Sequence, residues 1–431
     1  MPKTLQEIIK DEKKRQKLVI YINPPYAESA SATTATKKSD NKNKTNVSNT
    51  TRISEVWMKD MGKSIRELYV QFFVRIIKEI GGCVLATFST LKYINASNFV
   101  AFRKIFKGDF LGGFITPSET FDNVKEGFPI GFLIWNTHSK KKIQDINLDV
   151  FNKQGTRIGS KFFYPSYDTE TINQWIKKYA EYNTLYEISA MCCKGTDFQN
   201  SKYVNINFWN YLKGVGNAKG VTKFRLSKNN LIVSFVYFSV RHAIKATWIN
   251  DRDQFYAPNP LWEEDREFQS DCFAFALFHG QNKISSQNGI NYFIPFTEHE
   301  VGAKSAFESD FMTRFINGKV EFYNMNNSLY KNKSSKLEFS LQAKAVFNAG
   351  REIFIHYHVQ ASNTKSYNVN ASLYDIKEFF QGRDNRSGDM NDIKQAKDTR
   401  YKELMAVLGE TLGELAKKLE PKIYEYGFLK E

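Results

Sequence analysis

The feature that most constrains the fold is a short apolar run that two prolines stop abruptly. Residues 18–22 read Leu-Val-Ile-Tyr-Ile, a continuous run rich in β-branched side chains. Such runs are typical of strands buried on both faces of a parallel sheet. Asn23-Pro24-Pro25 follows, and proline has no N–H to donate to a β-ladder. The sequence therefore predicts a doubly buried strand over 18–22 that ends at Asn23.

The next hundred residues alternate between helical and strand-like patterns. Apolar residues recur at helical spacing until Gly81-Gly82, and later apolar runs are short enough for strands. The predicted order is a helix over 65–77, a strand over 83–88, a helix over 98–106, and strands over 110–115 and 131–135. Alternation of this kind is the signature of an α/β sheet.

The pattern changes after about residue 160. Strand-like runs such as 231–238 are separated by irregular polar and aromatic segments, which indicates a mixed domain with long loops. A leucine stripe then predicts a long helix from Lys394 to Tyr424. The polar, low-complexity stretch 28–52 predicts a mobile loop directly after the prolines, either closing over a substrate or serving as a tolerated surface insertion.

Composition narrows the class of partner. The chain has 431 residues and a formal net charge of +15, which favours a polyanion such as nucleic acid. Its four cysteines form no C-x-x-C pair, so neither a disulfide framework nor a zinc ribbon is expected. No apolar run reaches the length of a membrane span and the N-terminus is charged, which predicts a cytoplasmic protein.

Asn23-Pro24-Pro25-Tyr26, called here the NPPY element, carries the chemistry that the sequence suggests. Ligands of open α/β sheets bind at the carboxyl ends of strands. There, Asn23 Oδ1 and the Pro24 carbonyl can accept both hydrogens of an exocyclic amine, and Tyr26 offers an aromatic face to a base turned out of the duplex. The structural alternative is a rigid strand-to-loop turn with a packing tyrosine.

The NPPY element resembles the catalytic motif of DNA methyltransferases that modify the N6 amine of adenine. The resemblance extends over most of the chain and points to the Eco57I-like (type IIG-related) group, which includes fused restriction–modification enzymes. By this resemblance Asn23, Pro24, Pro25 and Tyr26 bind and stack the target base. Phe128 is the candidate for the opposite face of the base, and Phe132 competes with it. The other segments that carry the likeness are 81–86, 127–135, 248–255, 271–278 and 420–428.

The resemblance implies a partial Rossmann-like methyltransferase sheet, a mixed α+β target-recognition domain and C-terminal helices. Residues 1–160 correspond to the C-terminal half of the catalytic domain, 161–390 to the target-recognition and DNA-binding region, and 391–431 to a helical segment. Double-stranded DNA is the implied substrate and S-adenosylmethionine the implied cofactor.

The glycine-rich S-adenosylmethionine site of that family should precede the NPPY element, yet only 22 residues stand before Asn23. The glycines at 108–113 and Gly214-x-Gly216 lack the strand or the helix that such a site needs. We therefore expect the cofactor-binding half on a partner chain, and an adenine-N6 methyltransferase only when that half is supplied. The alternatives are a DNA-binding specificity module without catalysis and an inactive remnant of a restriction–modification gene.

Other constellations are weaker. His356 and His358 are predicted to share one strand face, either as a metal-binding pair or, more simply, as a surface pair. The basic segments 139–142 and 331–336 are candidate phosphate contacts or solvated loops. No nuclease pattern of an acid followed by Glu-x-Lys stands out, so restriction activity is not expected.

Overall fold

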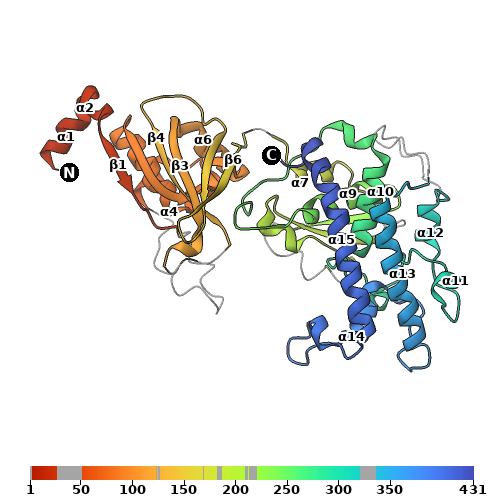
Figure 1. Cartoon of the computed structure of the whole chain (residues 1–431). Helices are drawn as coiled ribbons and strands as arrows, with labels where there is room; N and C mark the ends of the chain where they lie inside the picture. Colours follow the sequence, from red (N-terminus) through yellow and green to blue (C-terminus); the bar gives the residue numbers. More distant parts are fainter. Residues whose placement is uncertain are drawn as a thin grey trace.

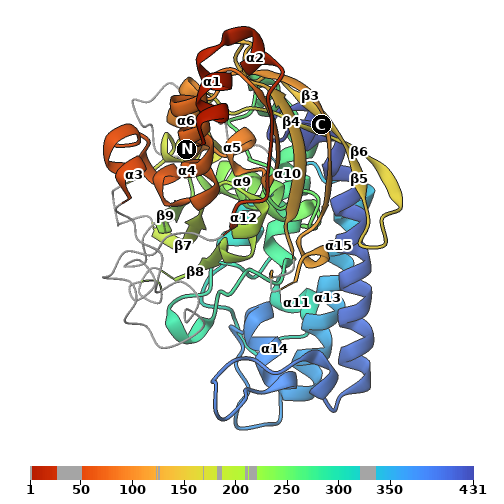
Figure 2. The same ribbon diagram turned by 90° about the vertical axis from the view of Figure 1, so that its left-hand side faces the viewer.

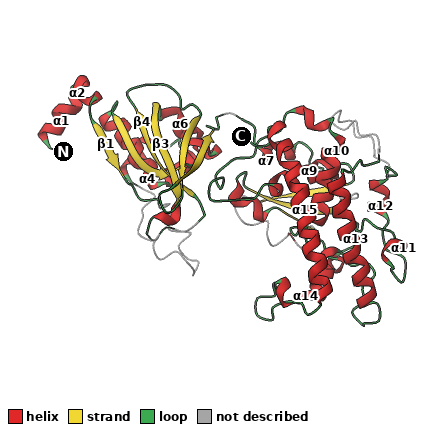
Figure 3. Ribbon diagram, in the orientation of Figure 1, coloured by secondary structure: helices red, strands yellow, loops and turns green. Residues whose placement is uncertain are grey.

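A computed structural model describes two lobes (Figure 1). Strands dominate the first lobe and helices the second, as Figure 3 shows by colour. The chain runs from the first lobe, whose last strand ends at Phe163, into the second, and the C-terminus returns to the junction. The described residues are 2–26, 51–122, 124, 127–167, 169–181, 187–208, 212, 221–320 and 336–431.

The first lobe is built on a six-stranded mixed sheet in the order β1-β2-β4-β3-β5-β6. β1 is parallel to β2, and β4 lies antiparallel between β2 and β3. β3 is parallel to β5, and β6 closes the sheet antiparallel to β5. The strands are β1 (Val19–Ile22), β2 (Val84–Thr90), β3 (Asp109–Pro117), β4 (Pro129–Asn136), β5 (Ile146–Phe151) and β6 (Arg157–Phe163).

Helices cover one face of this sheet, on one side of the strands in Figure 2. Tyr69, Phe73 and Phe102 pack from these helices against Leu85 and Trp135 of the strands. A π-helical turn extends α4 as far as Ile80, and Gly81 ends it with a φ of 81°. The helices of this lobe are α1 (Lys3–Lys10), α2 (Glu12–Gln16), α3 (Arg52–Trp57), α4 (Leu68–Arg75), α5 (Lys92–Asn95) and α6 (Val100–Ile105).

The prediction that the first strand is buried on both faces is wrong. β1 is an edge strand of the sheet. Ile20 and Ile22 pack against the core, whereas Val19 and Tyr21 are each 62% exposed. An apolar run of five residues cannot by itself distinguish a central strand from an edge strand whose second face lies bare.

The second lobe combines a three-stranded antiparallel sheet, in the order β8-β7-β9, with a helical bundle. α13 and α15 are the longest helices, and both pack against α10. The elements are α7 (Ile172–Lys177), β7 (Glu187–Lys194), β8 (Asn205–Asn207), β9 (Val221–Ser227), α9 (Leu231–Ala243), α10 (Arg266–Phe278), α11 (Glu298–Val301), α12 (Phe311–Ile316), α13 (Leu341–Ala361), α14 (Leu373–Gln381) and α15 (Thr399–Glu425).

Two sequence predictions in this lobe are wrong. Residues 231–238 were predicted as a strand but form most of the buried helix α9. A helix buried on all sides is apolar all round, so it shows no helical stripe and resembles a strand. His356 and His358 lie on α13 rather than on a strand, which removes the shared strand face.

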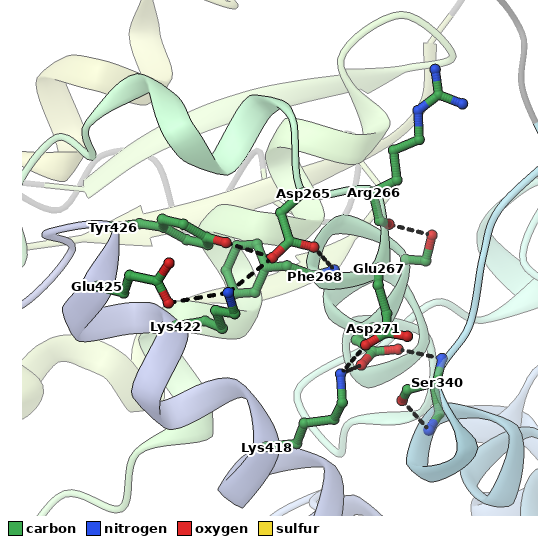
Figure 4. Close-up of polar contacts among 12 residues, drawn as sticks. Asp265, Arg266, Glu267, Phe268, Asp271, Ser340, Lys418, Lys422, Glu425 and Tyr426 are labelled. Atoms are coloured by element: carbon green, nitrogen blue, oxygen red, sulfur yellow. Dashed lines mark hydrogen bonds and ion pairs between the residues drawn. The ribbon is translucent and has the colours of Figure 1, made fainter.

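A cluster of ion pairs and hydrogen bonds joins α15 to α10 (Figure 4). Lys418 Nζ lies 2.6 Å from Glu267 Oε1 and 2.9 Å from Asp271 Oδ2. Asp265 caps α10 through the Phe268 N–H and also accepts a hydrogen bond from the Tyr426 hydroxyl. The segments 271–278 and 420–428, which both carry the family resemblance, are therefore held in one part of the lobe. Within the described ranges, no helix has the length and apolar composition that crossing a bilayer requires.

Candidate functional site

The NPPY element lies at the carboxyl end of β1, where the prolines end the strand. Pro24 is buried, while Asn23 and Pro25 are exposed and Tyr26 is half-buried. Because β1 and β2 are parallel, their carboxyl ends meet at the same edge of the sheet. Antiparallel β4 starts at that edge, since Ile130 pairs with Thr90 at the end of β2. Residues just before β4 are therefore brought to the edge that holds the NPPY element.

Within the element, Tyr26 and Asn23 bond to each other. The Tyr26 hydroxyl donates to Asn23 Oδ1 over 2.6 Å. Burial, assisted by the nearby Tyr21, raises the pKa of Tyr26 above its ordinary value, so the hydroxyl stays protonated and remains a donor. Asn23 Oδ1 therefore already accepts one internal hydrogen bond. An amide oxygen has two lone pairs, so the exposed Asn23 keeps one acceptor site beside this bond.

Phe121 is the residue at this edge that sequence reasoning missed. Its ring meets the Tyr26 ring edge-on, with centroids 5.8 Å apart, and lies 5.4 Å from the Phe88 ring. A short 3₁₀ turn, Ser118–Thr120, precedes it, and the Ser118 N–H donates to the Phe128 carbonyl over 2.9 Å. The signal that the sequence offered was the position of Phe121 between β3 and β4, which meet at the edge of the sheet that holds the NPPY element.

The structure separates the two candidates for a second base-contacting aromatic. Phe132 lies on the sheet face, with its ring centroid 4.9 Å from Phe88 and 6.2 Å from Tyr21. Phe128 turns toward the second lobe, where the guanidinium carbon of Arg252 lies 5.6 Å from its ring centroid. Of the two, Phe128 lines an open cleft.

The cleft lies between the lobes and has a volume of about 570 Å³. Phe128 contributes from the first lobe, and the end of α9, residues 198–202 and residues 244–252 contribute from the second. Among the described residues that line it, Asp251 is the one acid, set against four cations. The cations are Lys202, Arg241, Lys245 and Arg252.

Burial sets the charge of the cleft. The pKa of Asp251 is raised to about 6 by burial, although Arg252, whose Nε lies 3.0 Å from Asp251 Oδ2, opposes the rise. Burial lowers the pKa of His242 to about 4 and that of His279 well below its ordinary value. Both imidazoles are therefore neutral at pH 7, and the positive charge comes from lysine and arginine.

The remaining sequence candidates form no joint site. His356 Nε2 lies 2.9 Å from Asp398 Oδ2, and His358 Nδ1 lies 3.0 Å from the Tyr367 hydroxyl. Across the part of the chain that the structure describes, no three His, Cys, Asp or Glu residues gather in a way that could hold a metal ion.

The glycine and lysine segments that the sequence singled out likewise make contacts that account for them within the first lobe. Gly113 sits in β3, where a Cβ would meet the Phe132 carbonyl oxygen at 2.3 Å, so close strand packing accounts for this glycine. In the 139–142 segment, Lys141 pairs with Asp109 at 3.2 Å. Gly214, Gly216, almost all of the predicted loop 28–52 and residues 331–335 lie outside the described residues.

Comparisons with known proteins add little to this geometry. No family model matches the chain, and no curated protein matches it. Among solved structures, one match is a modification subunit of a putative type I restriction enzyme from Vibrio vulnificus YJ016. The identity is 12% and the TM-score 0.21, with 36% of this chain and 31% of that chain covered. A TM-score this low carries no argument about fold or function.

Proposed function

We propose that this chain supplies the target-adenine pocket and the DNA-recognition part of a site-specific DNA adenine-N6 methyltransferase of a restriction–modification system. The observation that carries the proposal is the NPPY element at the carboxyl end of a strand parallel to its neighbour. There Asn23 is exposed, and Tyr26 lies beside a second ring, Phe121. Rigid acceptors next to aromatic rings suit a planar base that carries an exocyclic amine.

In this proposal the target adenine leaves the duplex and brings its N6 amine to Asn23. The amine donates one hydrogen to the second lone pair of Asn23 Oδ1, beside the bond from the Tyr26 hydroxyl, and the other to the Pro24 carbonyl. Both bonds draw electron density onto the nitrogen and hold it in place. Tyr26 then stacks on the base, and Phe128 is the proposed contact for its other face. S-adenosylmethionine supplies the methyl group, and we assign its binding to a partner chain that carries the missing half.

The cleft between the lobes is the proposed path of the DNA. Its lysines and arginines outnumber its single lining acid among the described residues, and both histidines are neutral at pH 7. Cations in such a groove neutralise phosphates and release counterions. Phe128 places this groove next to the edge that holds the NPPY element.

Substitution of Asn23 tests the proposal. In the chain assembled with a polypeptide that carries a glycine-rich S-adenosylmethionine site, Asn23→Ala should lower methyl transfer to DNA by at least about 100-fold. DNA affinity should stay unchanged, because the duplex contacts lie elsewhere. Asn23→Asp keeps an acceptor oxygen and should retain part of the activity. Transfer of a radiolabelled methyl group to duplex DNA measures the effect, and an Asn23→Ala protein as active as the wild type refutes the proposal.

A second candidate function is a DNA-binding specificity module without catalysis. The observation in its favour is that the cleft draws most of its lining from the second lobe and none from the NPPY element. Such a module would bind one DNA sequence selectively, would keep that selectivity in a Tyr26→Ala variant, and would support no methyl transfer with any cofactor-binding partner. An inactive remnant would show neither binding nor transfer.

A further inference from the structure

One face of the first-lobe sheet has no helix over it among the described residues. The register places Val19 beside Val84, Tyr21 beside Ala86, and Phe88 beside Phe132 on this face. Val19 and Tyr21 are each 62% exposed. Tyr21, Phe88 and Phe132 do not belong to the hydrophobic core under the opposite face. The surface, called here the bare face, comprises Val19, Tyr21, Val84, Phe88, Phe114, Phe132 and Ile134.

The rings of the bare face form a continuous cluster. Phe132 lies 4.9 Å from Phe88, 5.6 Å from Phe114 and 6.2 Å from Tyr21, measured between ring centroids. Tyr21 is exposed and the three phenylalanines are half-buried. A contiguous apolar surface that solvent reaches is uncommon on a soluble monomer and marks an interaction site. Antiparallel pairs can leave one face to solvent, but parallel strands such as β1 and β2 are normally covered on both faces. The bare face around β1 therefore lacks the covering layer that parallel strands usually have.

The bare face is continuous with an open sheet edge. Among the described strands β1 pairs with β2 alone, so the main-chain groups on its other side have no strand partner. Val19 and Tyr21 belong both to that edge and to the bare face. An open edge can accept another strand through its N–H and C=O groups.

The handedness of β–α–β connections determines what can fill both surfaces. Parallel connections are right-handed, and the helices that follow β1 cover the opposite face of the sheet. Strands added outward from β1 wind in the other direction, so their helices fall on the bare face. One polypeptide with parallel strands and amphipathic helices can thus complete the edge and the face together. A nucleic acid has no peptide N–H and C=O groups with which to extend the β1 edge, so it could not fill both surfaces.

We infer that the β1 edge and the bare face form the docking surface for a polypeptide that completes a doubly wound α/β sheet. This inference rests on the proposed function in taking that polypeptide as the cofactor-binding half. The winding direction then reverses between β1 and the first added strand. Such a switch point is where doubly wound sheets bind ligands, beyond the carboxyl ends of their strands. The NPPY element stands at this switch point, so the partner's ligand and the acceptor Asn23 meet across the interface.

A first experiment needs only the chain itself. We expect the fluorescence of 8-anilinonaphthalene-1-sulfonate to rise on binding the purified wild type and to fall at least threefold when Tyr21→Lys and Phe132→Lys are combined. Val359→Lys, at an apolar residue of α13 that is 64% exposed, is the matched control. No dye enhancement in the wild type overturns the inference, because the chain would then cover the bare face itself. A homodimer that Tyr21→Lys dissociates also overturns it, since a second copy would be the occupant.

A second experiment identifies the partner. The chain is co-expressed with a polypeptide that carries a glycine-rich strand–turn–helix for S-adenosylmethionine, and the complex is measured by sedimentation. We expect a one-to-one complex that Val19→Lys with Tyr21→Lys weakens at least tenfold, whereas Val359→Lys leaves it intact. Circular dichroism checks that each variant folds. No complex with the wild type, or one indifferent to the β1 substitutions, overturns the inference.

The two proposals fail in different ways. A complex that assembles through β1 but transfers no methyl group supports the docking surface and refutes the methyltransferase function. Methyl transfer that depends on Asn23 but not on Val19 or Tyr21 supports the function and refutes the docking surface.

Discussion

The two lobes differ in how completely each covers its own apolar surface. The second lobe packs its helices around one another, so that α9 and α10 are buried along most of their length. The first lobe covers one face of its sheet and leaves Val19 and Tyr21 on the other face exposed. The bare face adjoins the NPPY element, whereas the closed lobe provides most of the basic cleft. The lobes thus differ in what covers their apolar side chains, and the proposed docking surface belongs to the first lobe alone.

Loose packing does not explain the bare face. On its covered side the first lobe buries Arg103 completely and uses it to donate to the carbonyls of Tyr93 and Ser166. The second lobe buries Arg241 in the same manner, with hydrogen bonds to the carbonyls of Gly195 and Asp197. Buried charges are tolerated only where such bonds are made. Both cores thus satisfy a buried arginine with hydrogen bonds. The difference between the lobes lies in the bare face of the first-lobe sheet.

The largest predicted difference between the two lobes is in how far the free energy of unfolding of each one falls in acid. Burial lowers the pKa of His242 to about 4, so the folded second lobe resists protonation that the unfolded chain accepts near pH 6.5. Stability from His242 is present above pH 6.5 and is lost as the pH falls toward 4. Part of the His242 ring lines the cleft, where solvent screens its charge. We therefore expect the free energy of unfolding to fall by on the order of 2 kcal/mol. Urea unfolding followed by circular dichroism, dominated by the helical second lobe, measures the loss at pH 7 and pH 4.5.

His242→Gln is the control, since glutamine keeps a polar group but does not titrate. It should remove the share of the pH dependence that comes from His242, whereas His279 and His358, whose pKa values burial also lowers, keep theirs. The first lobe carries one histidine, His138, at 3.0 Å from Gln16 Nε2. Because the other five histidines belong to the second lobe, the unfolding midpoint of the first lobe should shift less between the two pH values. Equal acid sensitivity of the lobes would contradict the assignment of the buried neutral imidazoles to the second lobe alone.

A smaller effect concerns the cleft that joins the lobes. Lys202 and Lys245 are exposed on its wall. If DNA lies there, each substitution by alanine should reduce the slope of log affinity against log salt by about 1. Together the two should weaken binding by about tenfold at moderate salt. Fluorescence anisotropy of a labelled duplex over a potassium chloride series measures both quantities.

Lys344→Ala provides the comparison, because Lys344 is exposed on α13, away from the cleft lining. It should leave the salt slope unchanged. If Lys344→Ala matches the cleft variants, binding follows the overall positive charge of the chain and the cleft has no special role.

The order of elements in the first lobe could be predicted from sequence because local signals there agree with the fold. Helical spacing over 65–77 corresponds to α4 and its π turn, and Gly81 ends it as expected. The strands predicted at 83–88, 110–115 and 131–135 all exist. Their partners could not be predicted, because the insertion of β4 between β2 and β3 depends on long-range pairing. For the same reason β1 was taken for a central strand.

The candidate site was predicted less completely. The NPPY element does stand at a strand end, and its assignment as a base pocket stays a prediction. Phe121 was missed because its approach to Tyr26 depends on a 3₁₀ turn with no distinctive sequence signal. α9 was mistaken for a strand because a helix in the centre of a core shows no polar stripe. Local patterns therefore locate the ends of strands better than they identify what packs around them.

The smallest predicted effect comes from the hydrogen bond within the NPPY element. Tyr26→Phe removes the hydrogen bond to Asn23 Oδ1 and keeps the ring. The lost bond should cost the free energy of unfolding about 1 kcal/mol or less. If the proposed function holds, methyl transfer by the assembled complex should stay within about threefold of wild type, since Asn23 Oδ1 can still accept the amine and the ring is kept. Thermal melting and kcat/KM for duplex DNA measure the two effects.

Tyr26→Ala separates the roles of the ring and the hydroxyl. Losing the stacking surface should lower kcat/KM by about tenfold or more, because base–aromatic stacking contributes about 1–3 kcal/mol per base. Should Tyr26→Phe lose as much as Tyr26→Ala, the hydroxyl would itself act on the substrate. The 2.6 Å bond to Asn23 would then be part of the working pocket. If both variants match the wild type, the ring packs against Phe121 as part of a strand-to-loop turn, and the base pocket lies elsewhere.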